Sequence, residues 1–200
     1  PGVVPVHELG IDAEGRVYFT MQLVRGRDLR HFYKKVRDGG WTVTRALNVL
    51  LKVCEAMAFA HSRNVVHRDL KPANVMVGRY GEVYVMDWGL ARVLSRRERD
   101  RGAAAAAGGE GVVRTSPLDT LDGTVIGTPF YMPPEQAAGR LADIGPASDV
   151  YAVGAMLYEL LAGTKPYLTE GQRPHPRAVL AMVMQGPPQP LHEVAPDAPM

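Results

Sequence analysis

Residues 67–74 read His67-Arg68-Asp69-Leu70-Lys71-Pro72-Ala73-Asn74, and the interpretation of the whole chain depends on this stretch. It carries a carboxylate at Asp69, an ammonium group at Lys71 and a carboxamide at Asn74. The apolar segments on either side, Val65-Val66 and Val75-Met76-Val77, are typical of short strands. The stretch is therefore predicted to be a polar loop between two strands.

These three side chains suit the transfer of a phosphoryl group, which needs positioning and charge neutralisation more than covalent help from the protein. A carboxylate such as Asp69 can lie next to the attacking hydroxyl, and a cation such as Lys71 can steady the transferred group. The amide oxygen of Asn74 can bind Mg²⁺. So can the carboxylate of Asp87, which follows a predicted strand thirteen residues further on. Gly89 gives the backbone freedom to turn there.

Three more stretches complete the pattern. They are Asp87-Trp88-Gly89, Gly127-Thr128-Pro129-Phe130-Tyr131-Met132-Pro133-Pro134-Glu135 and Ser148-Asp149-Val150-Tyr151. In order and spacing, the four stretches resemble those of a eukaryotic-type protein kinase domain, and they are most similar to bacterial serine/threonine kinases. Each short stretch alone is a weak signal, whereas chance agreement over the eight residues 67–74 is negligible. Trp88 stands where the family usually has Phe, and Pro133 where Ala or Ser is usual.

The resemblance implies an enzyme that uses ATP and Mg²⁺ to phosphorylate serine or threonine hydroxyls of a protein substrate. It makes Asp69 the catalytic base and places Lys71 on the γ-phosphate. Asn74 and Asp87 would hold Mg²⁺. Thr128 would hydrogen-bond near Asp69 and Lys71 and shape the substrate site, and its pairing with Lys71 resembles serine/threonine rather than tyrosine kinases.

The resemblance also implies the residues around the nucleotide. Met21 resembles the gatekeeper, and the stretch from Gln22 to Val24 resembles the hinge that hydrogen-bonds adenine. Asp28 would contact the ribose, and Met76 would pack under the adenine ring. Outside the nucleotide site, Asp149 would start a buried helix and brace the backbone of residues 67–74.

The implied fold is α+β, a two-lobe protein-kinase-like fold that is truncated. Residues 1–24 would be the last strands of the N-lobe, residues 22–28 the hinge, and residues 29–200 a mainly helical C-lobe that is incomplete at its C-terminus. The sequence pattern predicts these elements: strands at Val3–Leu9 and Val17–Val24, a break at Arg25–Asp28, helices at Leu29–Val36, after Thr42, at Asp149–Ala162 and at Arg177–Gln185, and an extended end over 186–200.

The helix after Thr42 shows the clearest periodicity. Its apolar residues recur at three- and four-residue steps and predict one buried stripe, and Cys54 beside the stripe is interpreted as a small buried hydrophobe. The stripe comprises Ala46, Leu50, Val53, Met57 and Ala60.

The stretch from Asp87 to Glu135 is long for the activation segment of a kinase. Arg68, directly before Asp69, is a feature of kinases that are switched on by a phosphate in this segment, because an arginine fork can hold the phosphate. Autophosphorylation is expected, with self-association of the kinase as its route. The candidate sites are Thr120 and Thr124, followed by Thr115 and Ser116.

The composition excludes some alternatives and leaves others open. A net charge of +2, from 23 basic and 21 acidic side chains, gives no electrostatic case for nucleic acid as the main partner and little support for a nucleic-acid or structural module. A pseudokinase scaffold stays open, although the four groups at 69, 71, 74 and 87 argue against it. A small-molecule kinase of related fold also stays open, although such enzymes usually lack a stretch like residues 127–135.

The first residues bear on activity and location. The chain starts at Pro1 without an initiator Met, which is interpreted as a truncation. The glycine-rich loop and the ATP-positioning lysine of the family would precede Pro1, so the fragment alone is expected to be inactive. No apolar run reaches the roughly 18–20 residues that span a bilayer. A single cysteine fits a reducing compartment, and the domain is expected to be cytoplasmic, whether or not the full-length protein is membrane-anchored.

Overall fold

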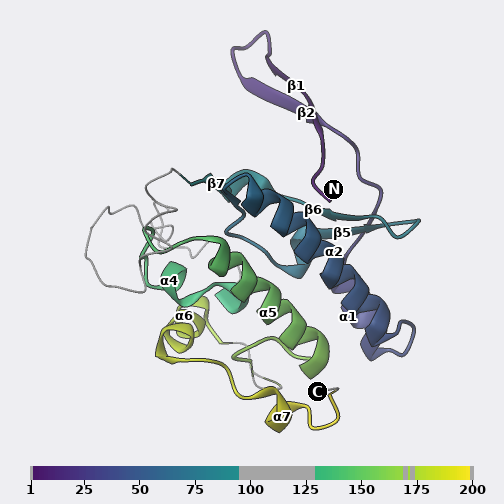
Figure 1. The fold of residues 1–200 in the computed structure, drawn as a ribbon, viewed down its shortest axis with the longest axis vertical. Coiled ribbons are helices and arrows are strands. Elements are labelled where there is room, and N and C mark those ends of the chain that lie inside the picture. The colour runs from purple at the N-terminus through teal and green to yellow at the C-terminus, as the bar shows by residue number, and fades with distance from the viewer. Residues whose placement is uncertain (1, 95–128, 169–170, 172–173, 199–200) are drawn as a thin grey trace. The chain divides into compact units, whose positions relative to one another are not determined.

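The computed structural model describes residues 2–94, 129–168, 171 and 174–198 (Figure 1). The chain forms two compact units. The first comprises residues 1–59 and 72–87, and the second comprises residues 60–71 and 88–200. The order of strands and helices agrees with the predicted α+β fold class.

A three-stranded antiparallel sheet forms the centre of the first unit. Its order is β3 (Gly26–Asp28), β5 (Val75–Gly78), β6 (Val83–Val85), and Val75 pairs with Val85. Val75 and Val77 are buried whereas Met76 between them is half-buried, as expected when alternate side chains point to opposite faces. The helix α1 (Leu29–Arg37) contacts this sheet through β3 and β5.

The segment that enters the sheet contains a strand that the sequence did not predict. Residues 25–28 were expected to end the preceding strand without forming one themselves, but Gly26–Asp28 pair with Met76–Gly78 of β5. The strand is short and polar, so it has no apolar alternation to reveal it. Gly26 is needed because a Cβ there would overlap the carbonyl oxygen of Val77.

The hairpin of β1 (Val6–Ile11) and β2 (Val17–Met21) forms a sheet of its own. In the turn, Asp12 Oδ1 accepts hydrogen bonds from the backbone N–H groups of Glu14 and Arg16. The bond from the Arg16 backbone is the largest cause that lowers the pKa of Asp12. Large apolar side chains of the hairpin and the following segment are exposed: Val6, Leu9, Ile11, Val17, Tyr18, Phe19, Met21 and Leu23.

Two helices follow, and a side chain caps the start of each. Asp28 caps α1, and its carboxylate accepts from the N–H of His31. The helix α2 (Val43–Ser62) starts directly after Thr42, whose hydroxyl accepts from the N–H of Arg45. All five residues of the predicted stripe on α2 are buried.

The interpretation of Cys54 was wrong, because its side chain is exposed. Cys54 immediately follows the buried Val53 in α2. One helical step rotates the side chain by about 100°, which carries it off the stripe. Partial desolvation still raises the pKa of the thiol.

The second unit is mainly helical, with a small sheet of β4 (Val65–Val66) and β7 (Arg92–Val93). Its α-helices are α4 (Pro134–Ala137), α5 (Pro146–Ala162), α6 (Pro176–Gln185) and α7 (Leu191–Val194). The helix α5 starts three residues earlier than predicted, and Asp149 lies in its first turn. It ends at Gly163, which has φ 70° as a left-handed C-cap.

The predicted extended end is only partly correct, because α7 forms within it. Pro190 precedes this helix with φ −55°, and a proline is compatible with the entry of a helix although not with its interior. The short 3₁₀ turns of the fold are η1 (Pro72–Asn74), η2 (Trp88–Leu90) and η3 (Pro129–Tyr131). None of the helices in the described residues has the length and apolar character that crossing a membrane requires.

Candidate active site

Asp149 fixes the backbone at the start of the loop of residues 67–74. Its carboxylate accepts hydrogen bonds from the N–H groups of His67 and Arg68, each at 2.9 Å. The side chain of Asp149 is only 1% exposed, so these bonds form where water does not compete. The predicted bracing of the loop by Asp149 is therefore confirmed.

The loop makes a tight turn at these residues. Arg68 has φ 72°, a left-handed conformation that is strained for a residue with a long side chain. The buried ring of His67 accepts from the N–H of Asp69 through Nδ1 at 3.2 Å, and it packs against Trp88 with ring centroids 4.7 Å apart. A hydrogen bond within the loop and ring packing against Trp88 therefore hold the turn.

Asp69 and Lys71 come together directly after this turn. Lys71 Nζ lies 2.6 Å from Asp69 Oδ2. The two side chains are 24% and 21% exposed, so both are partly shielded yet still within reach of solvent. A carboxylate and an ammonium group thus occupy one place in the second unit.

Asn74 and Asp87 are brought together in the first unit by the pairing of β5 and β6. Asn74 immediately precedes β5, and its carbonyl oxygen accepts from the N–H of Met86 at 2.7 Å. Asp87 is the next residue after Met86, so both oxygen donors lie at the same end of the hairpin. Asp87 is exposed and has φ 62°, which turns the chain sharply after β6.

The donor set of Asn74 and Asp87 fits Mg²⁺. Both offer hard oxygen ligands, and Mg²⁺ in nucleotide enzymes typically takes one or two protein oxygens and completes its shell with phosphate and water. Among the described residues, no group of three or more His, Cys, Asp or Glu side chains is arranged to hold a metal ion. A site built of one amide and one carboxylate does not require such a cluster.

The predicted nucleotide residues lie in the first unit. Met76 projects from the half-buried face of β5, opposite Asp28 of β3 in the strand register. The Asp28 carboxylate caps α1 and pairs with Arg30 at 2.6 Å, and the hydrogen bond from Arg30 is the largest cause that lowers its pKa. Met21 and Gln22 are exposed, and Val24 is half-buried.

Thr128 lies outside the described residues, and so do Thr115, Ser116, Thr120 and Thr124. The residues directly after Thr128 are anchored inside the second unit. Tyr131 donates a hydrogen bond to Glu159 at 2.6 Å with both side chains buried. The Glu135 carboxylate accepts from the hydroxyl of Ser148 at 2.5 Å, which ties α4 to the start of α5.

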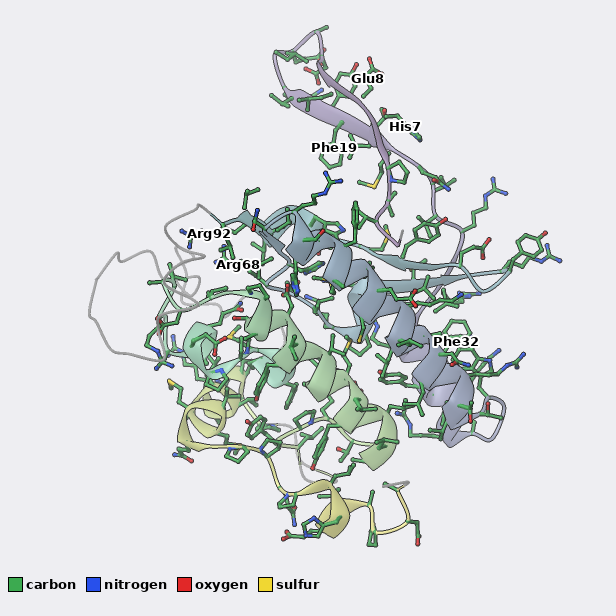
Figure 2. All side chains as sticks on the ribbon, viewed as in Figure 1. His7, Glu8, Phe19, Phe32, Arg68 and Arg92 are labelled. Carbon is green, nitrogen blue, oxygen red and sulfur yellow. The ribbon has the colours of Figure 1, made fainter. Side chains whose placement is uncertain are left out.

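Three residues at the loop were not singled out from the sequence. His61 Nε2 lies 2.8 Å from Asp149 Oδ2, and Gln136 donates to the carbonyl oxygen of Arg68 at 3.1 Å. Arg92 lies close to Arg68 (Figure 2). No local motif marks them, because each acquires its partner only through folding.

Arg68 is an unusual cation. Its Nε is buried and has no hydrogen-bond partner among the described residues. Burial is the largest cause that lowers the pKa of the Arg68 guanidinium, and the charge of Arg92 lowers it further, whereas Asp149 raises it. The pair of arginines offers positive charge and an unused donor to an anion.

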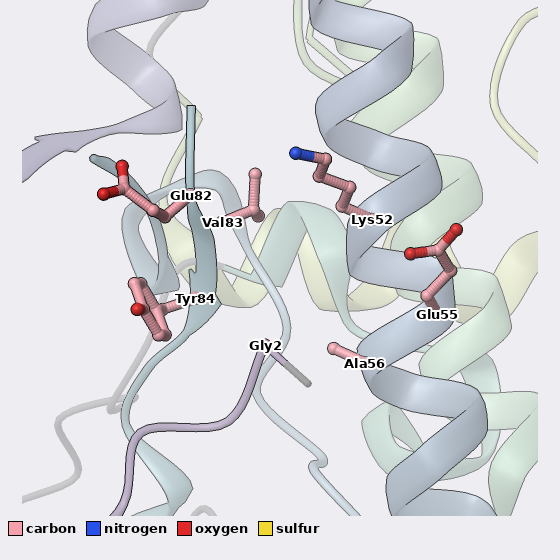
Figure 3. A pocket seen from close by; sticks show the side chains of 7 residues that line it. All are labelled: Gly2, Lys52, Glu55, Ala56, Glu82, Val83 and Tyr84. Atoms are coloured by element: carbon pink, nitrogen blue, oxygen red, sulfur yellow. The ribbon is translucent and has the colours of Figure 1, made fainter. Parts of the chain in front are cut away.

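A cavity in the first unit lies between α2 and β6 (Figure 3). Lys52, Ala56, Glu82 and Tyr84 contribute to its walls, and none of the predicted site residues lines it. Lys52 Nζ donates to the carbonyl oxygen of Gly81 at 2.9 Å, and the carboxylate of Glu82 accepts from the N–H of Tyr80. These polar groups hold the loop between β5 and β6. Since the cavity shares no residue with the predicted site, it is distinct from that site.

The comparison with protein families agrees with this geometry. Residues 2–192 match the model of the protein kinase domain. Since this match covers nearly the whole chain, the chain belongs to the protein kinase domain family.

Curated relatives of the chain are named serine/threonine-protein kinases. It is 34% identical over 177 residues to "Serine/threonine-protein kinase PknD" of Protochlamydia amoebophila, a match that covers 84% of this chain and 17% of the relative. It is 38% identical over 175 residues to "Probable serine/threonine-protein kinase PknB" of Corynebacterium glutamicum, covering 86% of this chain and 23% of the relative. The chain therefore spans only about a quarter or less of the length of these relatives.

Proposed function

We propose that the protein containing this chain transfers the γ-phosphate of ATP to serine or threonine hydroxyls of protein substrates. The carrying observation is the Asp69–Lys71 pair at 2.6 Å, which directly follows a strained turn that the buried Asp149 holds. A partly shielded carboxylate next to a fixed cation suits acceptance of a hydroxyl proton while negative charge develops on the transferred group.

The roles of the four central residues follow from this chemistry. Asp69 accepts the proton of the attacking hydroxyl, and Lys71 binds the γ-phosphate. Asn74 and Asp87 hold Mg²⁺ through their side-chain oxygens. When bound, the ion neutralises charge on the phosphates and orients them.

The remaining nucleotide and substrate contacts are proposed from the family resemblance. Adenine packs on Met76 beside the Met21 gatekeeper and bonds the backbone between Gln22 and Val24. In this scheme the ribose contacts Asp28. Thr128 shapes the acceptor site near Asp69 and Lys71, and the domain acts in the cytoplasm.

A transfer assay tests the proposal. The full-length protein is incubated with radiolabelled ATP and Mg²⁺, with protein acceptors and, separately, with aminoglycoside or choline. Labelling of serine or threonine in the protein acceptors is expected. Asp69→Asn and Asp87→Asn should each lower turnover by about a thousandfold or more, whereas Asp143→Asn, which alters an exposed Asp–Arg pair, should retain it.

The alternatives predict different outcomes of this assay. A pseudokinase would bind ATP and transfer nothing, and a small-molecule kinase would label only the small acceptor. Wild-type turnover by Asp69→Asn or Asp87→Asn would contradict the proposed roles of these residues.

We propose further that phosphorylation of the activation segment regulates the site, with self-association of the kinase as the route. The buried, unpartnered Nε of Arg68 and the neighbouring charge of Arg92 support an anion at this place. A phosphate carries about −1.5 to −2 charge at pH 7 and strong acceptor oxygens, so it would accept from Arg68 Nε and offset the positive charge of both arginines. The acceptors proposed first are Thr120 and Thr124, followed by Thr115 and Ser116.

Phosphopeptide mapping of the active protein tests this regulation. Phosphate on at least one of the four residues is expected, and Arg68→Gln should lower activity most in the phosphorylated form. Arg140→Gln is the matched control, because Arg140 is exposed and its side chain pairs with the exposed Asp143. Mapping that finds none of the four residues modified would remove this part of the proposal.

A further inference from the structure

The ammonium group of Lys165 lies over an aromatic ring in the second unit. Its Nζ is 5.2 Å from the centroid of the Phe130 ring, a distance at which the face of an aromatic ring attracts a cation. Both residues are half-buried, so part of each can still be reached by a ligand. Within the described part of the chain no carboxylate forms an ion pair with Lys165, so its charge has no internal counter-charge there.

The Phe130 ring is held by its surroundings. It packs against a buried apolar cluster of α4 and α6. The next residue, Tyr131, donates a hydrogen bond to the buried Glu159 of α5 at 2.6 Å. The ring is therefore a fixed platform for the cation. The residues of the cluster are Ala137, Val179, Leu180 and Val183.

The segment that carries Lys165 is restrained on both sides. It follows the left-handed C-cap of α5 at Gly163. Two residues after Lys165, Tyr167 has φ 64°, a conformation that persists in such a residue only where the surroundings fix it. The Tyr167 hydroxyl donates to the carbonyl oxygen of Gly186 at 2.9 Å and lies 2.9 Å from the hydroxyl of Tyr151. A cation that is already held in place loses less freedom when it binds an anion.

The platform belongs to the segment next to the proposed acceptor site. Phe130 comes two residues after Thr128, which is proposed to shape that site. Further along the same segment, Gln136 donates to the carbonyl oxygen of Arg68 at 3.1 Å, directly before Asp69. The segment is therefore connected on both sides of Phe130 to residues proposed to act on the substrate hydroxyl.

We infer that Lys165, held on Phe130, is a specificity residue that selects protein substrates with an aspartate or glutamate close to the phosphorylated serine or threonine. An ammonium group has three N–H donors, and the attraction to a ring face does not consume all of them. A substrate carboxylate can accept from these donors, whereas a basic side chain at the same place is repelled. The inference rests on the kinase function proposed above.

Peptide phosphorylation by the full-length protein tests the inference. Each peptide has one serine, and aspartate, glutamine or lysine occupies in turn every position on either side of it. At one position or more, aspartate should raise kcat/KM about fivefold over glutamine, the upper scale of a partly exposed ion pair. Lysine at the same position should lower it.

Variants of the platform separate the charge from the packing. Lys165→Met keeps an apolar stem without the charge, so the ratio of kcat/KM between the aspartate and glutamine peptides should fall from about five to about one. Lys165→Glu should reverse the preference in favour of lysine. Phe130→Leu keeps apolar packing against the cluster but removes the ring face, and the ratio should fall about twofold. A partly unfolded sample lowers both rates alike, so the ratio is independent of the folded fraction.

The matched control is Lys34→Met, because Lys34 is an exposed lysine of α1 in the first unit, and this variant should retain the wild-type ratio. A preference that persists in both Lys165→Met and Lys165→Glu would overturn the inference. So would a wild-type protein that phosphorylates the peptides without preferring aspartate at any position, and in both cases the proposed function would stand. A wild-type protein that phosphorylates no peptide or protein would contradict the proposed function itself, and the inference with it.

Discussion

The β1–β2 hairpin and the loop of residues 67–74 show opposite relations between composition and burial. The hairpin is rich in apolar residues, yet Leu9 is 73% exposed and Ile11 is 70% exposed. The loop is polar, yet His67 is fully buried and Asn74 is 6% exposed. Hydropathy alone would have predicted a buried hairpin and an exposed loop.

The difference lies in the partners that each region finds in the described part of the chain. The hairpin forms a sheet of its own, and a two-stranded ribbon cannot cover both of its faces. The loop has hydrogen-bond partners for its polar backbone, because Asp149 and Gln136 reach it from residues far along the chain. Burial of polar backbone costs little when each group is bonded.

Among the variants that test this comparison, Asp149→Ala is expected to lower the stability most. The change leaves the N–H groups of His67 and Arg68 and the donor of His61 without their acceptor. Unfolding free energy should fall by about 3 kcal/mol, in the range for breaking a buried charged network. Urea denaturation measures the loss. Asp143→Ala, at an exposed ion pair, should change it by less than about 1 kcal/mol.

Gly26→Ala should have the next largest effect. Gly26 starts β3, which joins the sheet after the exposed hairpin, and a Cβ would overlap the Val77 carbonyl oxygen. The pairing of β3 with β5 must then shift, which should cost about 2 kcal/mol. Gly154→Ala is the control, because a Cβ in the middle of α5 meets no atom within 4 Å and helix propensity should raise stability by up to about 1 kcal/mol. Equal stability of wild type and Gly26→Ala would contradict this prediction and would show that β3 can shift relative to β5 without a loss of stability.

Asp28→Ala tests the helix cap that follows the hairpin and should cost about 1 kcal/mol at pH 7. The pKa of Asp28 is lowered in the folded state, first by the bond from Arg30 and also by the His31 N–H. The stabilisation is therefore present above the ordinary Asp pKa and is lost as pH falls through the folded-state pKa. Denaturation of wild type and variant between pH 7 and pH 2 should show their difference shrinking in acid. Asp28→Asn, which keeps a capping oxygen, should lose less at pH 7; a larger loss than for alanine would argue against the cap.

The smallest effect is expected from Leu9→Ser in the hairpin of the 200-residue chain. Because Leu9 is 73% exposed, its replacement should change stability by less than about 0.5 kcal/mol. Val66→Ala, at a fully buried position that packs with Leu94 and Ile144, should cost about 1–3 kcal/mol by the same urea measurement. A hairpin variant as damaging as the core variant would break the comparison.

Local sequence signals predicted the elements that local chemistry decides. Thr42 and Gly163 mark helix ends because capping bonds and left-handed geometry involve only neighbouring residues. Where the signal was not local, the prediction failed. The strand β3 forms because β5 offers it an edge, and the short helix α7 forms within a proline-rich end that was predicted to be extended.

In the candidate site, too, the sequence predicted some of the residues and missed others. The sequence singled out Asp69, Lys71, Asn74 and Asp87, and the structure brings Asp69 to Lys71. It also places Asn74 and Asp87 at one end of a hairpin. The sequence did not reveal His61, because this histidine acquires its partner Asp149 from 88 residues away, only through folding.

The sequence by itself determined the family and the chemical groups of the site, because motif order and side-chain identity are properties of the linear chain. Only the tertiary structure decided which groups hold the loop and which cations lie next to each other. His61, Asp149 and Gln136 meet the loop, and Arg92 comes to Arg68, through packing of distant segments. The energies of these contacts depend on burial and distance, and both are set by the folded structure and not by the order of residues alone.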